Sequence, residues 1–294
     1  MNGRDSSVSP LATLVTLGRM VKLSHTVFAL PFALAAAAIA ARDRGITAGR
    51  IAGIVLAMAA ARTAAMGFNR IVDRRFDARN PRTAAREIPT GKVSLAAAWT
   101  LTLASTALFV AAAAFLGPLC LRLAPVALAL VFGYSFTKRF TWLCHLILGL
   151  AIAAGPAGAW IAVRGDFGAP PALLMLAVAT WIGGFDVLYS IADRDFDRSA
   201  RLHSIPARFG VTAALVISAV LHAATVAALM ALAAAAELGA YYLTGIAVVT
   251  AILIWEHAVV RPSDLSRLDM AFFNLNGYVA LVFLAATLAD VLLR

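Results

Sequence analysis

The sequence has few charged residues for its length. Only 14% of its 294 residues are Asp, Glu, Lys or Arg, whereas 62% are hydrophobic. A chain of this composition has too little polar surface to cover a water-soluble globule, so an ordinary soluble protein is excluded. The apolar residues are gathered in long runs, which predicts a polytopic membrane protein embedded in the lipid bilayer.

Cysteine is also scarce. Cys120 and Cys144 are the only two, and they do not form a CxxC pair. Two isolated thiols support neither a disulfide framework nor a cysteine-ligated metal site, so we expect both to have packing roles.

Nine apolar segments are long enough to cross a bilayer as helices. They lie near residues 23–41, 51–69, 95–116, 119–136, 141–163, 171–192, 211–235, 238–260 and 271–292. Gly117 and Pro118 separate the third segment from the fourth. The predicted fold is an all-α bundle of nine transmembrane helices that forms one domain over residues 1–294, with the two termini on opposite sides.

Acidic residues are fewer than basic ones, 15 against 25. The loops on one side of the predicted spans carry 18 of the Lys and Arg residues, and those on the other side carry 6. Since positive loops stay in the cytoplasm, we expect the N-terminus inside and the C-terminus outside. The first 22 residues do not have the pattern of a cleavable signal peptide. The predicted location is a bacterial inner membrane, and no nucleic-acid partner is expected.

The stretch Gly67–Lys92 concentrates charge in an otherwise apolar chain, with seven Lys or Arg and three acids. On a helix Asn69, Asp73 and Asp77 are spaced four residues apart and share one stripe. Such oxygen donors suit Mg²⁺, which proteins usually hold with one or two carboxylates and the oxygens of a substrate phosphate. The sequence therefore predicts a magnesium and phosphate site on this stripe.

A second stretch, 186–210, repeats the first. An offset of 120 residues aligns Asp73 with Asp193 and Asp77 with Asp197, and five of seven positions match. The repeat predicts two pseudo-repeats that each bring one aspartate-rich helix end to a shared site. Asp186 shares a helix face with Asp193 and Asp197, whereas Asp195 is expected to face solvent.

These motifs resemble the UbiA family of intramembrane aromatic prenyltransferases. The similarity rests on N-R-x-x-D-R-x-x-D followed by R-T-A-x-R-x-I-P-x-G in the first stretch, and on D-x-x-Y-x-x-x-D-R-D-x-D in the second. The resemblance covers the whole chain. It implies that an allylic polyprenyl diphosphate loses its diphosphate with the help of Mg²⁺ and that the resulting cation attacks an electron-rich phenolic ring.

The resemblance and the charges together assign roles to individual residues. The catalytic set is Asn69, Asp73, Asp77, Asp193 and Asp197, whose four aspartates are also the expected metal ligands. The residues expected to bind diphosphate are Lys22, Arg70, Arg74, Lys138 and Arg194. Those expected at the aromatic substrate are Tyr134, Arg139, Asp186 and Tyr189.

An allylic cation reacts with water unless water is excluded, so an apolar chamber should adjoin the motifs. The aromatic candidates to line it are Phe68, Tyr134, Trp181, Phe185 and Tyr189. Arg62, seven residues before Asn69, either pairs with a carboxylate across the bundle or lines this pocket.

The acceptor is left open by the sequence. H-T-V-F-A-L-P-F-A-L and N-P-R-T-A-x-R-E-I-P resemble the branch that prenylates 4-hydroxybenzoate for ubiquinone, while a dihydroxynaphthoate for menaquinone is the alternative. From another class, paired repeats with membrane carboxylates also occur in ion-coupled transporters. Aspartates at helix ends, accompanied by many arginines, favour the enzyme.

Overall fold

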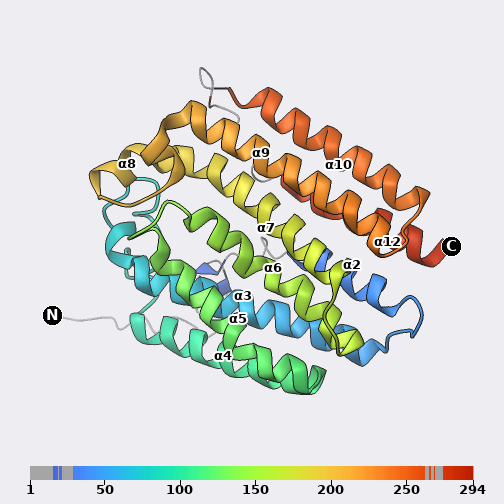
Figure 1. Ribbon diagram of the computed structural model, residues 1–294. Coiled ribbons are helices and arrows are strands. Elements are labelled where there is room, and N and C mark those ends of the chain that lie inside the picture. Colours follow the sequence, from blue (N-terminus) through green and yellow to red (C-terminus); the bar gives the residue numbers. More distant parts are fainter. Residues whose placement is uncertain are drawn as a thin grey trace.

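The computed structural model describes residues 16–18, 20–21, 29–261, 265, 268 and 274–293. The described chain is a helical bundle, shown in Figure 1. Its helices are α2 (Leu30–Ala41), α3 (Ala48–Asp77), α4 (Leu95–Leu116), α5 (Pro118–Thr137), α6 (Cys144–Arg164), α7 (Ala169–Ser190), the 3₁₀ turn η2 (Ile191–Asp193), α8 (Arg194–Ser199), α9 (Ile205–Ala235), α10 (Ala240–Val259) and α12 (Asn276–Leu293).

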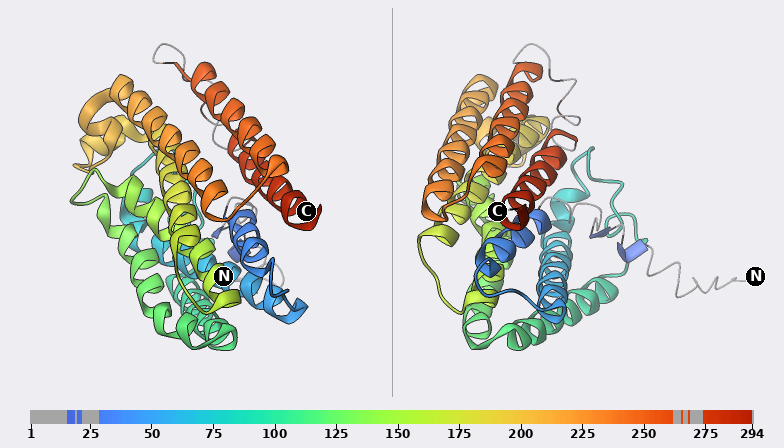
Figure 2. Two further views of the ribbon diagram at one scale, coloured as in Figure 1. Left: turned by 45° about the vertical axis from the view of Figure 1, so that its right-hand side comes forward. Right: turned by 90° about the vertical axis from the view of Figure 1, so that its right-hand side faces the viewer.

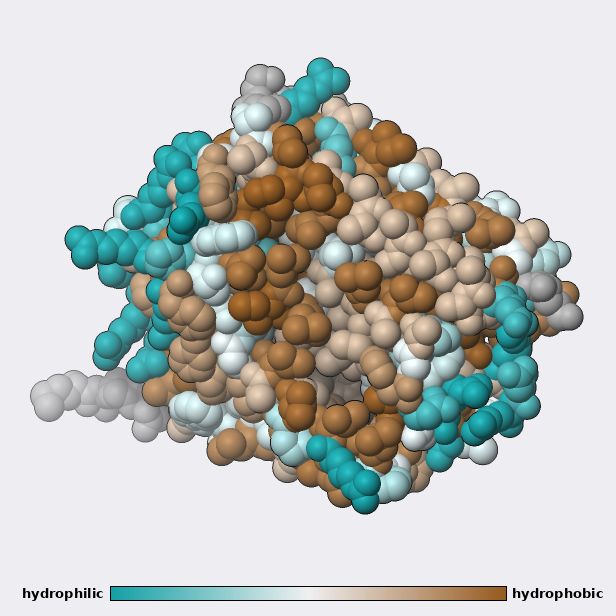
Figure 3. Space-filling model, in the orientation of Figure 1, coloured by the Kyte–Doolittle hydropathy of each residue, from teal (hydrophilic) through white to brown (hydrophobic). Residues whose placement is uncertain are grey.

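Eight of these helical segments are long and apolar enough to cross a membrane, counting α7 to α8 as one. They coincide with eight of the nine predicted spans. The first predicted span, 23–41, appears as the shorter apolar helix α2, and residues 22–28 lie outside the described part of the chain. A hydrophobic band separates two hydrophilic ends on the face shown in Figure 3, as expected for a bundle surrounded by lipid.

Local sequence signals set the helix boundaries. Thr47, Ser94 and Ser204 each accept a hydrogen bond from the third backbone N–H of the helix that follows, which is the usual N-cap contact. Gly117 adopts φ 141°, a conformation that favours glycine, and Pro118 begins α5. The predicted break between the third and fourth spans is therefore confirmed.

The long helices run side by side, with α8 at one end of the bundle and the C-terminus at the other (Figure 1). Helix α6 packs against α2, α5 and α7. A Cβ atom on Gly149 of α6 would lie 2.1 Å from the backbone oxygen of Ala179 of α7, so only glycine permits this close approach. In Figure 2, α4 and α5 lie on the opposite side of the bundle from α10 and α12.

Two helix starts repeat with nearly the offset found in the sequence. Helix α7 begins 121 residues after α3, and α10 begins 122 residues after α5, close to the 120 residues that separate the two motifs. Helices α3 and α7 both deliver a motif to the α8 end of the bundle, where the loop between α3 and α4 also lies. This arrangement brings two distant stretches of sequence together.

Candidate active site

The two aspartate motifs line one cavity of about 240 Å³ at the α8 end of the bundle. Its walls come from α3, α5, α6, α7, α8 and the loop between α3 and α4. The predicted site residues that line it are Asn69, Asp73, Asp77, Tyr134, Lys138, Arg139, Asp186, Tyr189, Asp193 and Asp197. The structure therefore brings both motifs to a single opening.

The first motif occupies the last turns of α3. Asn69 Nδ2 donates a hydrogen bond of 2.8 Å to Asp73 Oδ2, and Arg139 Nη2 lies 3.1 Å from Asp73 Oδ1. Asp77, one turn further on, pairs with Arg86 at 2.6 Å. The four-residue spacing does place the amide and both carboxylates along one side of the cavity.

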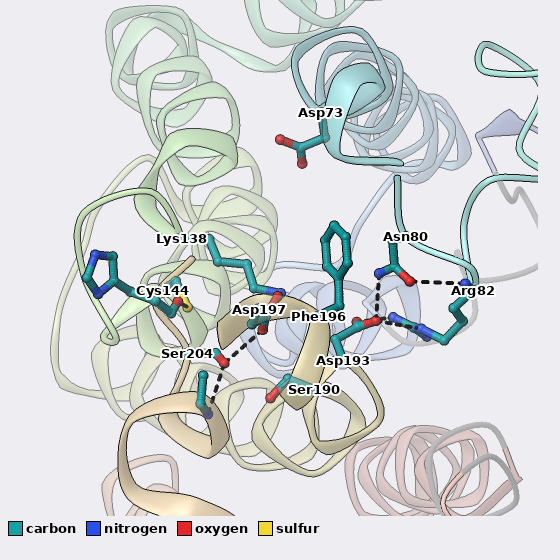
Figure 4. Close-up of polar contacts among 12 residues, drawn as sticks. Asp73, Asn80, Arg82, Lys138, Cys144, Ser190, Asp193, Phe196, Asp197 and Ser204 are labelled. Atoms are coloured by element: carbon teal, nitrogen blue, oxygen red, sulfur yellow. Dashed lines mark hydrogen bonds and ion pairs between the residues drawn. The ribbon is translucent and has the colours of Figure 1, made fainter. Parts of the chain in front are cut away.

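The second motif receives cations from elsewhere in the chain. Asp193 accepts hydrogen bonds from Arg82 and Asn80, both in the loop that follows the first motif. Asp197, whose side chain is 1% exposed, lies 2.8 Å from Lys138 Nζ and accepts a 2.8 Å hydrogen bond from Ser204. Figure 4 shows these contacts, with Asp73 on the far side of the opening from Asp193 and Asp197. The loop that follows the first motif therefore supplies hydrogen-bond donors to the second motif.

Two cations outside the spans are held in their charged forms by these carboxylates. Burial by itself would lower the pKa of Lys138, but the carboxylate of Asp197 raises it above the ordinary value. Burial likewise opposes the charge on Arg82, and its hydrogen bonds to Asp193 more than offset this and raise its pKa. Both side chains therefore remain cationic at neutral pH.

The α7 helix tightens into the 3₁₀ turn η2 between Asp186 and Asp193 before α8 begins. Asp195 points away from the cavity: its side chain is 83% exposed and pairs with Arg194 at 2.9 Å. This confirms the predicted solvent-facing position of Asp195.

Three arginines expected to bind diphosphate do not line the cavity. Arg70 is buried and donates to the backbone oxygen of Met20, and Arg74 donates to the oxygen of Ile71 on its own helix. Arg194 is occupied by Asp195 at the surface. Lys22 lies outside the described residues.

Sequence reasoning missed several residues that do line the cavity, namely Asn80, Arg82, Arg86, Ser135 and His145. Arg82 and Arg86 belong to the R-T-A-x-R segment, so the motif itself contained the signal. They stand in an irregular loop, where helical periodicity gives no information about direction.

An apolar chamber of about 590 Å³ adjoins the polar cavity, and both are lined by Tyr134 and Leu148. Its walls are mainly small and aliphatic side chains of α3, α4, α5 and α6, together with Met58, Met66 and Phe109. Arg62 also lines it, with a buried Nε atom that has no hydrogen-bond partner in the described part of the chain. Of the two readings of Arg62, the structure supports the pocket position.

The predicted aromatic lining of this chamber is mostly wrong. Trp181 and Phe185 belong to the hydrophobic core, where Trp181 packs 4.8 Å from Phe32. Phe68 instead packs against Phe132, at 4.7 Å between ring centres. These aromatic side chains pack between helices, because they lie on helix faces that contact neighbouring helices and not on faces that line the chamber.

The model of the UbiA prenyltransferase family matches residues 29–278. The chain belongs to this family. It is therefore a multi-pass membrane prenyltransferase rather than an ion-coupled transporter.

The chain is similar in sequence to bacterial proteins named 4-hydroxybenzoate octaprenyltransferase. It is 32% identical over 240 residues to a 4-hydroxybenzoate octaprenyltransferase of Pseudomonas aeruginosa (strain UCBPP-PA14), covering 82% of this chain and 80% of the relative. A protein of the same name from Vibrio parahaemolyticus is 30% identical over 90% of each chain.

Solved structures share the UbiA fold. The apo structure of a UbiA homolog from Aeropyrum pernix K1 is 36% identical, with a TM-score of 0.84 over 92% of this chain and 99% of that one. A UbiA homolog from Archaeoglobus fulgidus bound to DMAPP and Mg²⁺ has a TM-score of 0.64 at 19% identity, over 91% of this chain and 99% of that one.

The cavity offers carboxylate oxygens, the type of donor that a hard cation prefers. Four carboxylates from two helix ends face one opening, and the buried Oδ2 atom of Asp77 has no hydrogen-bond partner among the described residues. Within the described part of the chain, no three acidic, histidine or cysteine side chains are gathered closely enough to ligate a metal together. Each of the four carboxylates is instead paired with Arg or Lys, so metal binding would require these pairs to rearrange.

Proposed function

We propose that this UbiA-family protein transfers a polyprenyl group from an allylic polyprenyl diphosphate to an aromatic hydroxy acid such as 4-hydroxybenzoate, in quinone biosynthesis. The proposal rests on the place where the polar cavity meets the apolar chamber. A cavity lined by paired aspartates, Arg and Lys opens next to an apolar chamber, and Tyr134 lines both. Such a junction suits a donor with a charged head and an apolar tail.

The diphosphate would bind among the cations of the cavity. We assign Lys138, Arg82 and Arg86 to it, because they line the cavity while Arg70, Arg74 and Arg194 do not. The metal ligands would be Asp73, Asp77, Asp193 and Asp197, with Asn69 beside them. Mg²⁺ bound there would neutralise the diphosphate and assist its departure.

The chain's own side chains would support the same step. Positive charge fixed in place before the reaction stabilises the charge that grows on the leaving diphosphate, with little reorganisation during the reaction. The apolar chamber would hold the prenyl chain away from water and so preserve the allylic cation until the ring attacks it.

The acceptor's carboxylate needs a cation, and two arginines are available. Arg139 already pairs with Asp73 at 3.1 Å, whereas the buried Nε atom of Arg62 has no hydrogen-bond partner among the residues that the structure describes. Tyr134 lines both the chamber that contains Arg62 and the cavity that contains Asp186. We therefore propose Arg62 as the principal contact for the carboxylate, with Tyr134 and Tyr189 near the ring.

Arg62→Met tests this assignment. A hydrogen bond to a charged group contributes about 1.5–3 kcal/mol, so KM for the aromatic acid should rise about 10- to 150-fold while KM for the donor stays unchanged. Arg50→Met is the control, because Arg50 is exposed near the start of the same helix. An unchanged KM for the acid in Arg62→Met would refute the contact.

The acceptor itself is tested with purified protein in lipid. The protein is given Mg²⁺, one polyprenyl diphosphate and either 4-hydroxybenzoate or a dihydroxynaphthoate, and products are identified by mass spectrometry. We expect prenylated 4-hydroxybenzoate. Turnover of the naphthoate alone would redirect the proposal to menaquinone synthesis, and turnover of neither would reject an aromatic acid acceptor.

The cavity should face the cytoplasm of a bacterial inner membrane, because the positively charged loops predict that orientation. A reporter inserted near Pro81 should therefore be cytoplasmic, and one fused after Arg294 should lie outside. Accessibility of the two reporters to an impermeant reagent in intact cells distinguishes the sides. Both reporters on one side would contradict the predicted odd number of spans.

A further inference from the structure

Asp186 differs from the other carboxylates that line the cavity. Asp73, Asp77, Asp193 and Asp197 each pair with Arg or Lys. Among the described residues, the hydrogen-bond partner of Asp186 is instead a histidine: His145 Nδ1 lies 2.7 Å from Asp186 Oδ2. The side chain of Asp186 is 25% exposed, whereas that of His145 is 2% exposed. One carboxylate of the site is therefore held without Arg or Lys.

The contact made by His145 Nε2 determines whether Nδ1 carries the ring proton. The backbone N–H of Ile205 donates to His145 Nε2 at 3.2 Å. It belongs to the first turn of α9, whose N–H groups have no partner within the helix. Because Nε2 accepts this bond, the proton of the neutral ring is on Nδ1 and is donated to Asp186.

His145 is thus fixed by three elements. It comes from α6, its acceptor Asp186 comes from α7, and its donor Ile205 comes from α9. A neutral histidine with both nitrogens engaged is suited to orient Asp186 rather than to exchange protons with a substrate. A proton can instead be exchanged at the carboxylate of Asp186, which is partly exposed.

Prenylation of an aromatic ring must release a proton. The bond between the allylic carbon and the diphosphate oxygen breaks, with the electron pair leaving on diphosphate. A ring carbon next to the hydroxyl then bonds to the allylic carbon. The electrons of its C–H bond return to the ring, and the proton must pass to a base.

We propose that Asp186 accepts this ring proton and that His145 is the residue that positions it. The proposal rests on the proposed function and adds the base that the reaction requires. A carboxylate paired with Arg, Lys or a metal is a weaker base, because an opposite charge beside it favours the ionised form. Asp186 retains the hydrogen bond from His145 on one oxygen while the other is protonated, and its exposure lets the proton pass to solvent afterwards.

The experiment compares His145→Met, His145→Gln and Asp186→Asn in purified protein, with 4-hydroxybenzoate and with the ring-deuterated acid. Methionine removes both hydrogen bonds, whereas a glutamine amide can donate to Asp186 and accept from Ile205. Because a general base typically contributes about 10²- to 10⁴-fold, kcat should fall by that range in Asp186→Asn and His145→Met. The KM for each substrate should change little, and His145→Gln should recover most of kcat.

The isotope effect separates a chemical role from a structural one. If proton removal becomes slow in His145→Met and Asp186→Asn, deuterium on the ring should lower their kcat further, while wild-type kcat is unaffected. His203→Met, an exposed histidine outside the cavity, is the control and should behave like wild type.

Three results would overturn the proposal. Asp186→Asn could retain full kcat, the impaired variants could show no deuterium effect, or His145→Gln could be as impaired as His145→Met. A wild-type protein that prenylates no aromatic acid would be a different result, since it would reject the proposed function together with this base.

Discussion

Asp193→Asn should lower kcat/KM for prenyl transfer by about 10²- to 10³-fold, the scale on which preorganised charge contributes to catalysis. Asparagine keeps the shape of the side chain but removes its charge. Arg82 and Asn80 both donate hydrogen bonds to Asp193. In the variant Arg82 would lose its ionic partner, and the proposed metal would lose a ligand. The measurement is steady-state turnover at saturating Mg²⁺ in lipid, and Asp73→Asn should behave similarly.

The matched control is Asp195→Asn, two residues away. Asp195 is 83% exposed and forms only a surface pair with Arg194, so the same chemical change should alter kcat/KM by less than about fivefold. Thermal unfolding of both variants checks that each remains folded. Near-normal turnover in Asp193→Asn, or an equal loss in Asp195→Asn, would contradict the assigned site.

Asp77→Ala and Asp197→Ala should each lower activity by about 10²- to 10³-fold, and the double variant should lose little more than the worse of the two. The two residues lie on different motifs but line one cavity. Once one motif no longer holds the diphosphate, the other has nothing left to stabilise, so the effects are not additive.

The control cycle pairs Asp77→Ala with Asp195→Ala. Asp195 lies outside the cavity, so its small effect should add to that of Asp77. Losses that multiply in the Asp77 and Asp197 double variant would indicate two independent sites.

Helical periodicity predicted the parts of the site that lie on regular helices. Four-residue spacing placed Asp73 and Asp77 on one side of α3, and the angular position of Asp195 predicted its exposure. The repeat offset of 120 residues predicted that Asp193 and Asp197 would meet them. These inferences needed only the geometry of a helix and the internal repeat.

The rest depended on tertiary structure. Arg70 follows Asn69 directly, yet about 100° of helical rotation turns it away from the cavity, toward Met20. Arg82 reaches Asp193 because an irregular loop crosses to the other motif, and no local pattern encodes that path. His145 stands alone at the start of α6, and its role becomes visible only when α7 and α9 are in place.

The claim that two motifs form one magnesium-dependent diphosphate site is tested most directly by donor binding. Calorimetry with a polyprenyl thiolodiphosphate, which resists ionisation, would measure stoichiometry with and without Mg²⁺ in the wild type, Asp77→Ala and Asp197→Ala. We predict one analogue per chain, bound only with Mg²⁺ and lost in both variants. Binding that persists in either variant, that needs no Mg²⁺, or that reaches two analogues per chain would contradict the shared site.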